Sequence, residues 1–153
     1  MKKEPPAQGS GAGRTMGLDV GEKTLGVAIG DELGWTAQPY GTIRRGNLPQ
    51  DLAALRRLVA EHRVSAIVVG LPKDMRGTLG RQARLVMAFA DRIEAEVGVP
   101  VTLWDERLTT VAAERVLLEA NLSRGKRKKQ VDKIAAALIL QSFLDYRGSG
   151  GGR

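Results

Sequence analysis

The sequence of 153 residues contains no cysteine, which excludes disulfide bonds, thiolate metal sites and thiol nucleophiles. Only 4% of the residues are aromatic, so the chain offers few platforms on which unpaired bases could stack. No apolar run approaches the roughly 20 residues that a membrane-spanning helix needs, and the first residues lack the apolar region of a secretory signal. We therefore expect a soluble protein without a membrane partner, and the lack of cysteine is compatible with a reducing cytosol.

Basic residues outnumber acidic residues in the sequence. The chain has 24 Lys and Arg against 17 Asp and Glu, a formal net charge of +7. This balance favours a polyanionic partner such as nucleic acid, although many ordinary soluble proteins are also basic. The length suits one compact domain. We expect this domain at residues 14–147, between flexible tails at 1–13 and 148–153.

Hydrophobic periodicity predicts a β-hairpin followed by alternating helices and strands. Apolar residues alternate on both sides of the turn at 21–23, and a weaker third strand follows at about 35–43, where Pro39 indicates an edge or a bulge. Helices are expected at about 47–62, 79–97, after Thr109 or Thr110, and at 130–146, with strands at 64–70 and 99–104. The order β-β-β-α-β-α-β-α-α is the plan of the ribonuclease-H-like α/β fold, a mixed five-stranded sheet with helices on both faces. That fold hosts nucleases, transposases and actin-like ATPases, so it does not decide the function.

Three acidic positions fall where these elements could form a site. Asp19 lies in the first strand, on the side opposite its apolar neighbours, although a lone Asp there could simply accept hydrogen bonds from the next turn. Asp105 and Glu106 follow a strand, at the end where α/β sheets place ligands, and alternation does not say which of them faces Asp19. Asp132 begins the last helix, where it could merely favour the helix dipole. Taken together, the acids suit Mg²⁺ or Mn²⁺ and metal-assisted phosphodiester hydrolysis.

Four motifs carry a resemblance to a known family. They are MGLDVGEK at 16–23, GLPKDMRG at 70–77, DERLTT at 105–110 and KKQVD at 128–132. With these motifs in this order, the chain closely resembles the bacterial YqgF (RuvX) family from about Thr15 to Tyr146. The resemblance implies a cytoplasmic nuclease that processes the 5′ end of precursor 16S ribosomal RNA, with resolution of Holliday junctions or branched DNA as the alternative. It places the catalytic and metal-binding acids at Asp19, at Glu106 rather than Asp105, and at Asp132.

One feature departs from the related RuvC-type resolvases, which carry two acids one turn apart on the last helix. Here the position three residues before Asp132 is Lys129, and the position three residues after it is Ala135. We therefore expect a second metal ion to be weakly held or to receive ligands from the substrate.

The cations near these motifs are candidate phosphate ligands. We interpret the basic stretch around Asp132 as a loop that orders on binding, although such runs are often only solvated loops. The loop at 73–80 opens a helix, and its backbone N–H groups could receive a phosphate. The expected substrate-binding residues are Lys73, Arg76, Arg81, Arg107, Arg124, Lys126, Arg127, Lys128, Lys129 and Lys133.

Two other classes of protein fit parts of the sequence. Residues 17–24 also resemble the first phosphate loop of actin-like ATPases, but those enzymes need two lobes and this length supplies one. A catalytically silent nucleic-acid-binding module that assists ribosome assembly would need the basic surface alone. We expect a monomer or a homodimer, since a resolvase must place two sites symmetrically. Trp35 and Trp104 are interpreted as core or edge packing, and His62 as a surface residue.

Overall fold

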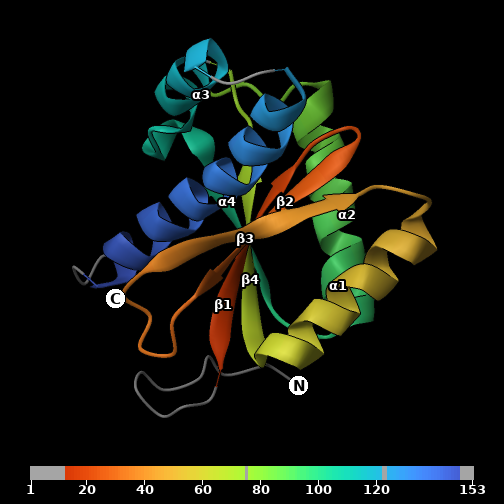
Figure 1. The fold of residues 1–153 in the computed structure, drawn as a ribbon. Coiled ribbons are helices and arrows are strands. Elements are labelled where there is room, and N and C mark those ends of the chain that lie inside the picture. Colours follow the sequence, from red (N-terminus) through yellow and green to blue (C-terminus); the bar gives the residue numbers. More distant parts are fainter. Residues whose placement is uncertain (1–12, 75, 122–123, 149–153) are drawn as a thin grey trace.

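The computed structural model describes residues 13–74, 76–121 and 124–148. Within these ranges it describes all side chains except those of residues 121 and 124–129. Its elements are β1 (Arg14–Val20), β2 (Thr24–Gly30), β3 (Ala37–Arg44), α1 (Leu48–His62), β4 (Val64–Leu71), α2 (Arg81–Val97), β5 (Val101–Asp105), the 3-10 helix η1 (Glu106–Leu108), α3 (Val111–Asn121) and α4 (Arg124–Gly148). The predicted order of strands and helices is confirmed (Figure 1). Among the described helices, none has the length and apolar character needed to cross a membrane.

The five strands form one mixed sheet in the order β3-β2-β1-β4-β5. β1 pairs antiparallel with β2 and parallel with β4, which in turn pairs parallel with β5. The carboxyl ends of β1, β4 and β5 therefore lie at the same end of the sheet, where open α/β sheets place their ligands.

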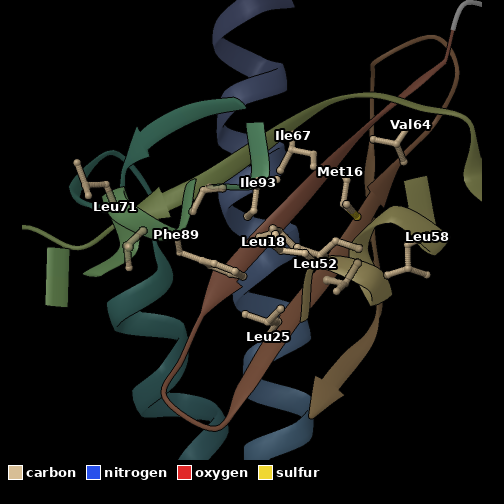
Figure 2. Close-up of a cluster of buried hydrophobic side chains, with 14 of the residues drawn as sticks. Met16, Leu18, Leu25, Leu52, Leu58, Val64, Ile67, Leu71, Phe89 and Ile93 are labelled. Carbon is tan, nitrogen blue, oxygen red and sulfur yellow. The ribbon is translucent and has the colours of Figure 1, made fainter. Parts of the chain in front are cut away.

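Helices cover both faces of this sheet, as predicted (Figure 1). On one face, α1 and α2 bury a core that includes Met16, Leu18 and Phe89 (Figure 2). On the other face, α4 packs through Ala136, Ile139 and other small or aliphatic residues, and α3 packs against α4. The fold thus combines one well-filled apolar layer with a second layer in which a single long helix covers the sheet.

The long helix lies very close to the sheet because β1 and β2 present glycines to it. A Cβ on Gly26 would lie 2.0 Å from the carbonyl oxygen of Asp132, and a Cβ on Gly17 would lie 2.8 Å from that of Ala136. Ala135 and Ala136 are themselves buried at this contact. The lack of side-chain volume on both partners lets α4 bring Asp132 directly over the hairpin.

Two local predictions about chain geometry are confirmed. Asn47 caps α1, because its side chain accepts a hydrogen bond from the Gln50 amide while the Gln50 side chain accepts one from the Asn47 amide. β3 is an edge strand, and Pro39 lies at an irregularity in its register with β2. A proline is tolerated there because an edge strand has one side without ladder hydrogen bonds.

Two other predictions are wrong. α4 begins at Arg124 rather than near Gln130, so the basic stretch before Asp132 is helical and not a loop. Lys, Arg and Gln all have high helix propensity, which sequence periodicity alone does not register. Trp35 is 70% exposed instead of packed, whereas Trp104 is half-buried and contacts the rings of Phe143 and Tyr146 as expected.

Candidate active site

Asp19 is a buried carboxylate near the carboxyl end of β1. Its neighbour Leu18 belongs to the core under α1 and α2, so strand alternation turns Asp19 away from that core, as predicted, and therefore toward the face that α4 covers. The residue is only 5% exposed. Burial raises the pKa of Asp19 to about 6; the cation of Arg115 opposes this shift and the anion of Asp132 adds to it. Asp19 is therefore an acid held in an environment that disfavours its unpaired anion.

Glu106 reaches the same region from the end of β5. Its side chain folds over β4 at Gly70, where a Cβ would lie 2.9 Å from Glu106 Oε2. Because β4 lies between β5 and β1, this direction brings Glu106 toward Asp19. Burial raises the pKa of Glu106 to about 7, and the charge of Asp19 contributes to the rise. The charges of Asp19 and Glu106 therefore interact within one site.

Asp105 points elsewhere. Its Oδ1 accepts a hydrogen bond from the backbone amide of Arg107, its Oδ2 accepts one from Arg107 Nη2 at 2.7 Å, and Lys73 Nζ lies 3.6 Å from Oδ2. The hydrogen bonds from the Arg107 side chain are the main reason why the pKa of Asp105 falls to about 2. Sequence alternation left Asp105 and Glu106 undecided, and the structure separates them: Glu106 turns toward Asp19, and Asp105 holds two cations.

Asp132 approaches from α4. Its carboxylate Oδ2 accepts a hydrogen bond from the hydroxyl of Thr24, the first residue of β2. The backbone contact with Gly26 and this hydrogen bond fix Asp132 beside the hairpin. Its charge acts on Asp19, since Asp132 is one of the causes of the raised pKa there.

Arg115 is a fourth residue of this region, and the sequence analysis missed it. Its Nη2 donates a hydrogen bond to Asp19 Oδ1 at 2.9 Å, from a position in α3 that is 96 residues away in the chain. Helical periodicity cannot tell which arginine of a basic protein meets a distant acid. The only signal in the sequence was its place in the helix that follows the DERLTT motif.

The donor set suits a hard divalent cation in its chemistry. Carboxylate oxygens are the ligands that Mg²⁺ and Mn²⁺ prefer, and a cation between Asp19 and Glu106 would relieve their repulsion. The guanidinium of Arg115 already supplies a positive charge to Asp19 through an ion pair. Within the described part of the chain, however, no three Asp, Glu or His side chains stand close enough to hold one metal ion. The assignment of Asp19, Glu106 and Asp132 as metal ligands therefore stays a prediction.

The predicted phosphate ligands are distributed unevenly around these acids. Lys73 and Arg107 flank Asp105, and the Arg107 guanidinium lies against Gly77. Arg76 and Arg81 are exposed, and Lys133 is half-buried next to Asp132. The side chains of Arg124, Lys126, Arg127, Lys128 and Lys129 lie outside the described residues.

The loop before α2 differs in one respect from the sequence-based expectation. The amides of Arg76 and Thr78 donate to the carboxylate of Asp74, at 2.9 and 2.8 Å. The expectation that the backbone N–H groups of this loop receive a phosphate is therefore wrong for these two, because an acid of the loop itself already satisfies them.

Comparison with known proteins places the chain among close relatives. A family described as RuvX, Holliday junction resolvase, matches residues 13–146. A protein of Moorella thermoacetica is 60% identical over 138 residues, which cover 90% of this chain and 99% of the relative. A protein of Symbiobacterium thermophilum is 55% identical over 136 residues, covering 89% of this chain and 94% of the relative. Both relatives are named, provisionally, as pre-16S rRNA nucleases.

Solved structures give a more distant likeness. Thermus thermophilus RuvC in complex with a Holliday junction substrate matches with a TM-score of 0.59 at 16% identity, covering 90% of this chain and 96% of that one. A second Thermus thermophilus RuvC structure matches with a TM-score of 0.55 at 15% identity, again covering 90% of this chain and 96% of that one. At such identities the likeness concerns the fold, and it confirms the ribonuclease-H-like prediction. The family match over nearly all of the ordered elements and the identities of 55–60% show that the chain belongs to the RuvX family.

Proposed function

We propose that this chain is a divalent-metal-dependent nuclease that processes the 5′ end of precursor 16S ribosomal RNA in the bacterial cytoplasm. The observation that carries the proposal is a pair of acids at the carboxyl ends of two strands, the buried Asp19 and the half-buried Glu106, with the charge of Asp132 acting on Asp19. Membership of the RuvX family and the names of its close relatives support phosphodiester hydrolysis and the ribosomal RNA precursor.

Asp19, Glu106 and Asp132 would hold Mg²⁺ or Mn²⁺, which would supply an activated water and stabilise the leaving 3′ oxygen. The protein's own contribution is to keep two acids together in a site that water reaches poorly. Burial raises the pKa values of both acids because it destabilises their anions. A bound cation would stabilise these anions, so the raised pKa values favour a cation site.

Among the cations predicted from the sequence, Lys73 and Arg107 have contacts that support binding of the substrate backbone near Glu106. Both are held by Asp105, which directly precedes Glu106 in the chain. A phosphate that binds them would therefore lie next to the acidic site. Such contacts supply affinity and register but little sequence information, which suits recognition of the shape of a folded RNA.

Resolution of branched DNA is the second candidate function. The description of the matching family and the shared fold with RuvC favour it. A resolvase must cut two strands symmetrically and therefore acts as a dimer. The ribosomal RNA precursor remains the first choice because relatives at 55–60% identity carry that name.

One preparation tested on three substrates would decide between these functions. Precursor 16S RNA with its 5′ extension, unstructured RNA and a four-way DNA junction are incubated with Mg²⁺ or Mn²⁺, and products are resolved on gels. We expect specific cleavage of the precursor, lost in Asp19→Asn with binding retained. Asp91→Asn, which removes an exposed acid from α2, is the matched control. Cleavage of the junction alone would contradict the RNA assignment, and cleavage of nothing with any divalent ion would contradict the nuclease itself.

A further inference from the structure

The ion pair between Asp19 and Arg115 joins a fixed residue to one that solvent can reach. Asp19 belongs to the middle of the sheet, and its side chain is 7% exposed. The side chain of Arg115 comes from α3 and is 35% exposed. The guanidinium therefore has a path away from the carboxylate, whereas the carboxylate has none away from the guanidinium.

The helix that carries Arg115 lies at the outside of the fold (Figure 1). It packs chiefly against α4, and Val111 at its first turn is buried, while Val116 and Leu117 beside Arg115 are exposed. Release of the Arg115 side chain would leave this anchoring contact in place. The ion pair can thus open without disruption of either hydrophobic core.

The role of Arg115 in this structure is that of a counter-ion. A buried carboxylate near two further acids is costly unless a cation compensates it. Arg115 binds Oδ1, an oxygen that a divalent cation on Asp19 would also use. Two positive groups at one carboxylate oxygen repel each other, so the arginine and the ion compete.

We propose that Arg115 is an exchangeable counter-ion, which neutralises Asp19 until a divalent cation takes this carboxylate and then binds a backbone phosphate of the nucleic acid. The inference rests on the proposed function, since it requires Asp19 to bind such an ion. A guanidinium next to the acids is well suited to its second partner, because its fork of N–H donors matches the oxygens of a phosphate.

Binding of Mn²⁺ without nucleic acid tests the first half. Arg115→Gln removes the competing cation. The control Arg92→Gln removes an equal charge from an ion pair with Glu96 on α2, which covers the face of the sheet opposite to α4. By titration calorimetry we expect Arg115→Gln to bind Mn²⁺ roughly five-fold tighter or more, at the lower end of typical coupling between linked sites. Arg92→Gln should stay within about two-fold of the wild type. Equal or weaker Mn²⁺ binding by Arg115→Gln overturns the proposal.

The wild-type chain provides a second readout that does not depend on how this variant folds. The NMR signal of the Arg115 Nε–H group, assigned through its loss in Arg115→Lys, should shift when Mg²⁺ is added and return with a chelator. The Arg92 signal should not move. If the Arg115 signal does not shift at saturating Mg²⁺, the proposal that the ion displaces Arg115 from Asp19 is overturned.

Affinity for RNA tests the second half. Fluorescence anisotropy with a labelled precursor fragment is measured in saturating Ca²⁺ and in a chelator, with gels to show that the RNA stays intact. We expect Arg115→Gln to bind RNA several-fold more weakly than the wild type in Ca²⁺ and equally well in the chelator, where Arg115 is occupied by Asp19. A loss under both conditions, or under neither, overturns the proposal.

The failure of this inference is distinguishable from failure of the proposed function. If the wild type binds no divalent ion, both fail. If the wild type binds Mn²⁺ through Asp19, as shown by loss of binding in Asp19→Asn, but Arg115→Gln binds it no more tightly, only the exchange fails.

Discussion

Gly26 and Asp132 meet backbone to backbone: a Cβ added to Gly26 would lie 2.0 Å from the carbonyl oxygen of Asp132 and 2.4 Å from its carbonyl carbon. Gly26 is also the residue that pairs with Asp19 across the β-hairpin. A single glycine therefore sets how closely the acid on α4 approaches the acid on β1.

Gly26→Ala should consequently damage both stability and the site. The new methyl group meets main-chain atoms, which cannot rotate away, so α4 must move off the sheet. We expect a loss of about 1–3 kcal/mol in the free energy of unfolding, measured by urea titration, and weaker Mn²⁺ binding. Gly41→Ala is the control, since a Cβ there meets nothing within 4 Å. Equal stability of the two variants would contradict the close approach.

Gly70→Ala should separate the effect on the site from the effect on stability. A Cβ at Gly70 would lie 2.5 Å from Ile139 Cδ1 and 2.9 Å from Glu106 Oε2, both at the far ends of flexible side chains. These ends can shift, so we expect a smaller cost in unfolding free energy than for Gly26→Ala. Displacement of Glu106 should lower kcat/KM on precursor RNA by about ten-fold or more. Unchanged kcat/KM would indicate that Glu106 does not act from its position over Gly70.

The raised pKa values of Asp19 and Glu106 predict how stability depends on pH without divalent ions. Both pKa values, about 6 and about 7, exceed the usual 3.8 and 4.5, so between pH 4 and 7 the folded state binds more protons than the unfolded one. Stability should therefore fall as pH rises through this window, by an amount on the order of 2 kcal/mol for Glu106. Urea titrations in a chelator at pH 5 and pH 7.5 measure it.

Glu106→Gln should lose much of this pH dependence, because its amide is neutral at both pH values. Glu119→Gln, an exposed position on α3, should keep the wild-type slope. A wild-type protein that is more stable at pH 7.5 than at pH 5 in the chelator would show that neither acid is strained by burial.

The fold and the positions of two of the acids within it could be predicted from the sequence, because their signals are local. Alternation in β1 directs Asp19 away from the apolar core, and the position of Asp132 near small residues of the last helix follows from spacing. The choice of Glu106 over Asp105 lay beyond alternation, since β5 ends at Asp105 and the chain turns there into η1. Arg115 meets Asp19 only through the packing of α3 on α4, a long-range relation that periodicity does not contain.

Asp105→Asn tests the division of labour between the two adjacent acids. Asn can still accept the hydrogen bond from the Arg107 amide, but it loses the charge that holds Lys73 and the Arg107 guanidinium. These pairs are partly exposed and each contributes about 1 kcal/mol or less, so we expect KM for RNA to rise a few-fold with kcat nearly unchanged. Glu106→Gln, which removes a single charge at the next position, should instead abolish cleavage with RNA binding retained. Steady-state kinetics on the precursor measures both variants. If Asp105→Asn lost kcat as completely as Asp19→Asn while Glu106→Gln stayed active, the catalytic acid would be Asp105 and not Glu106.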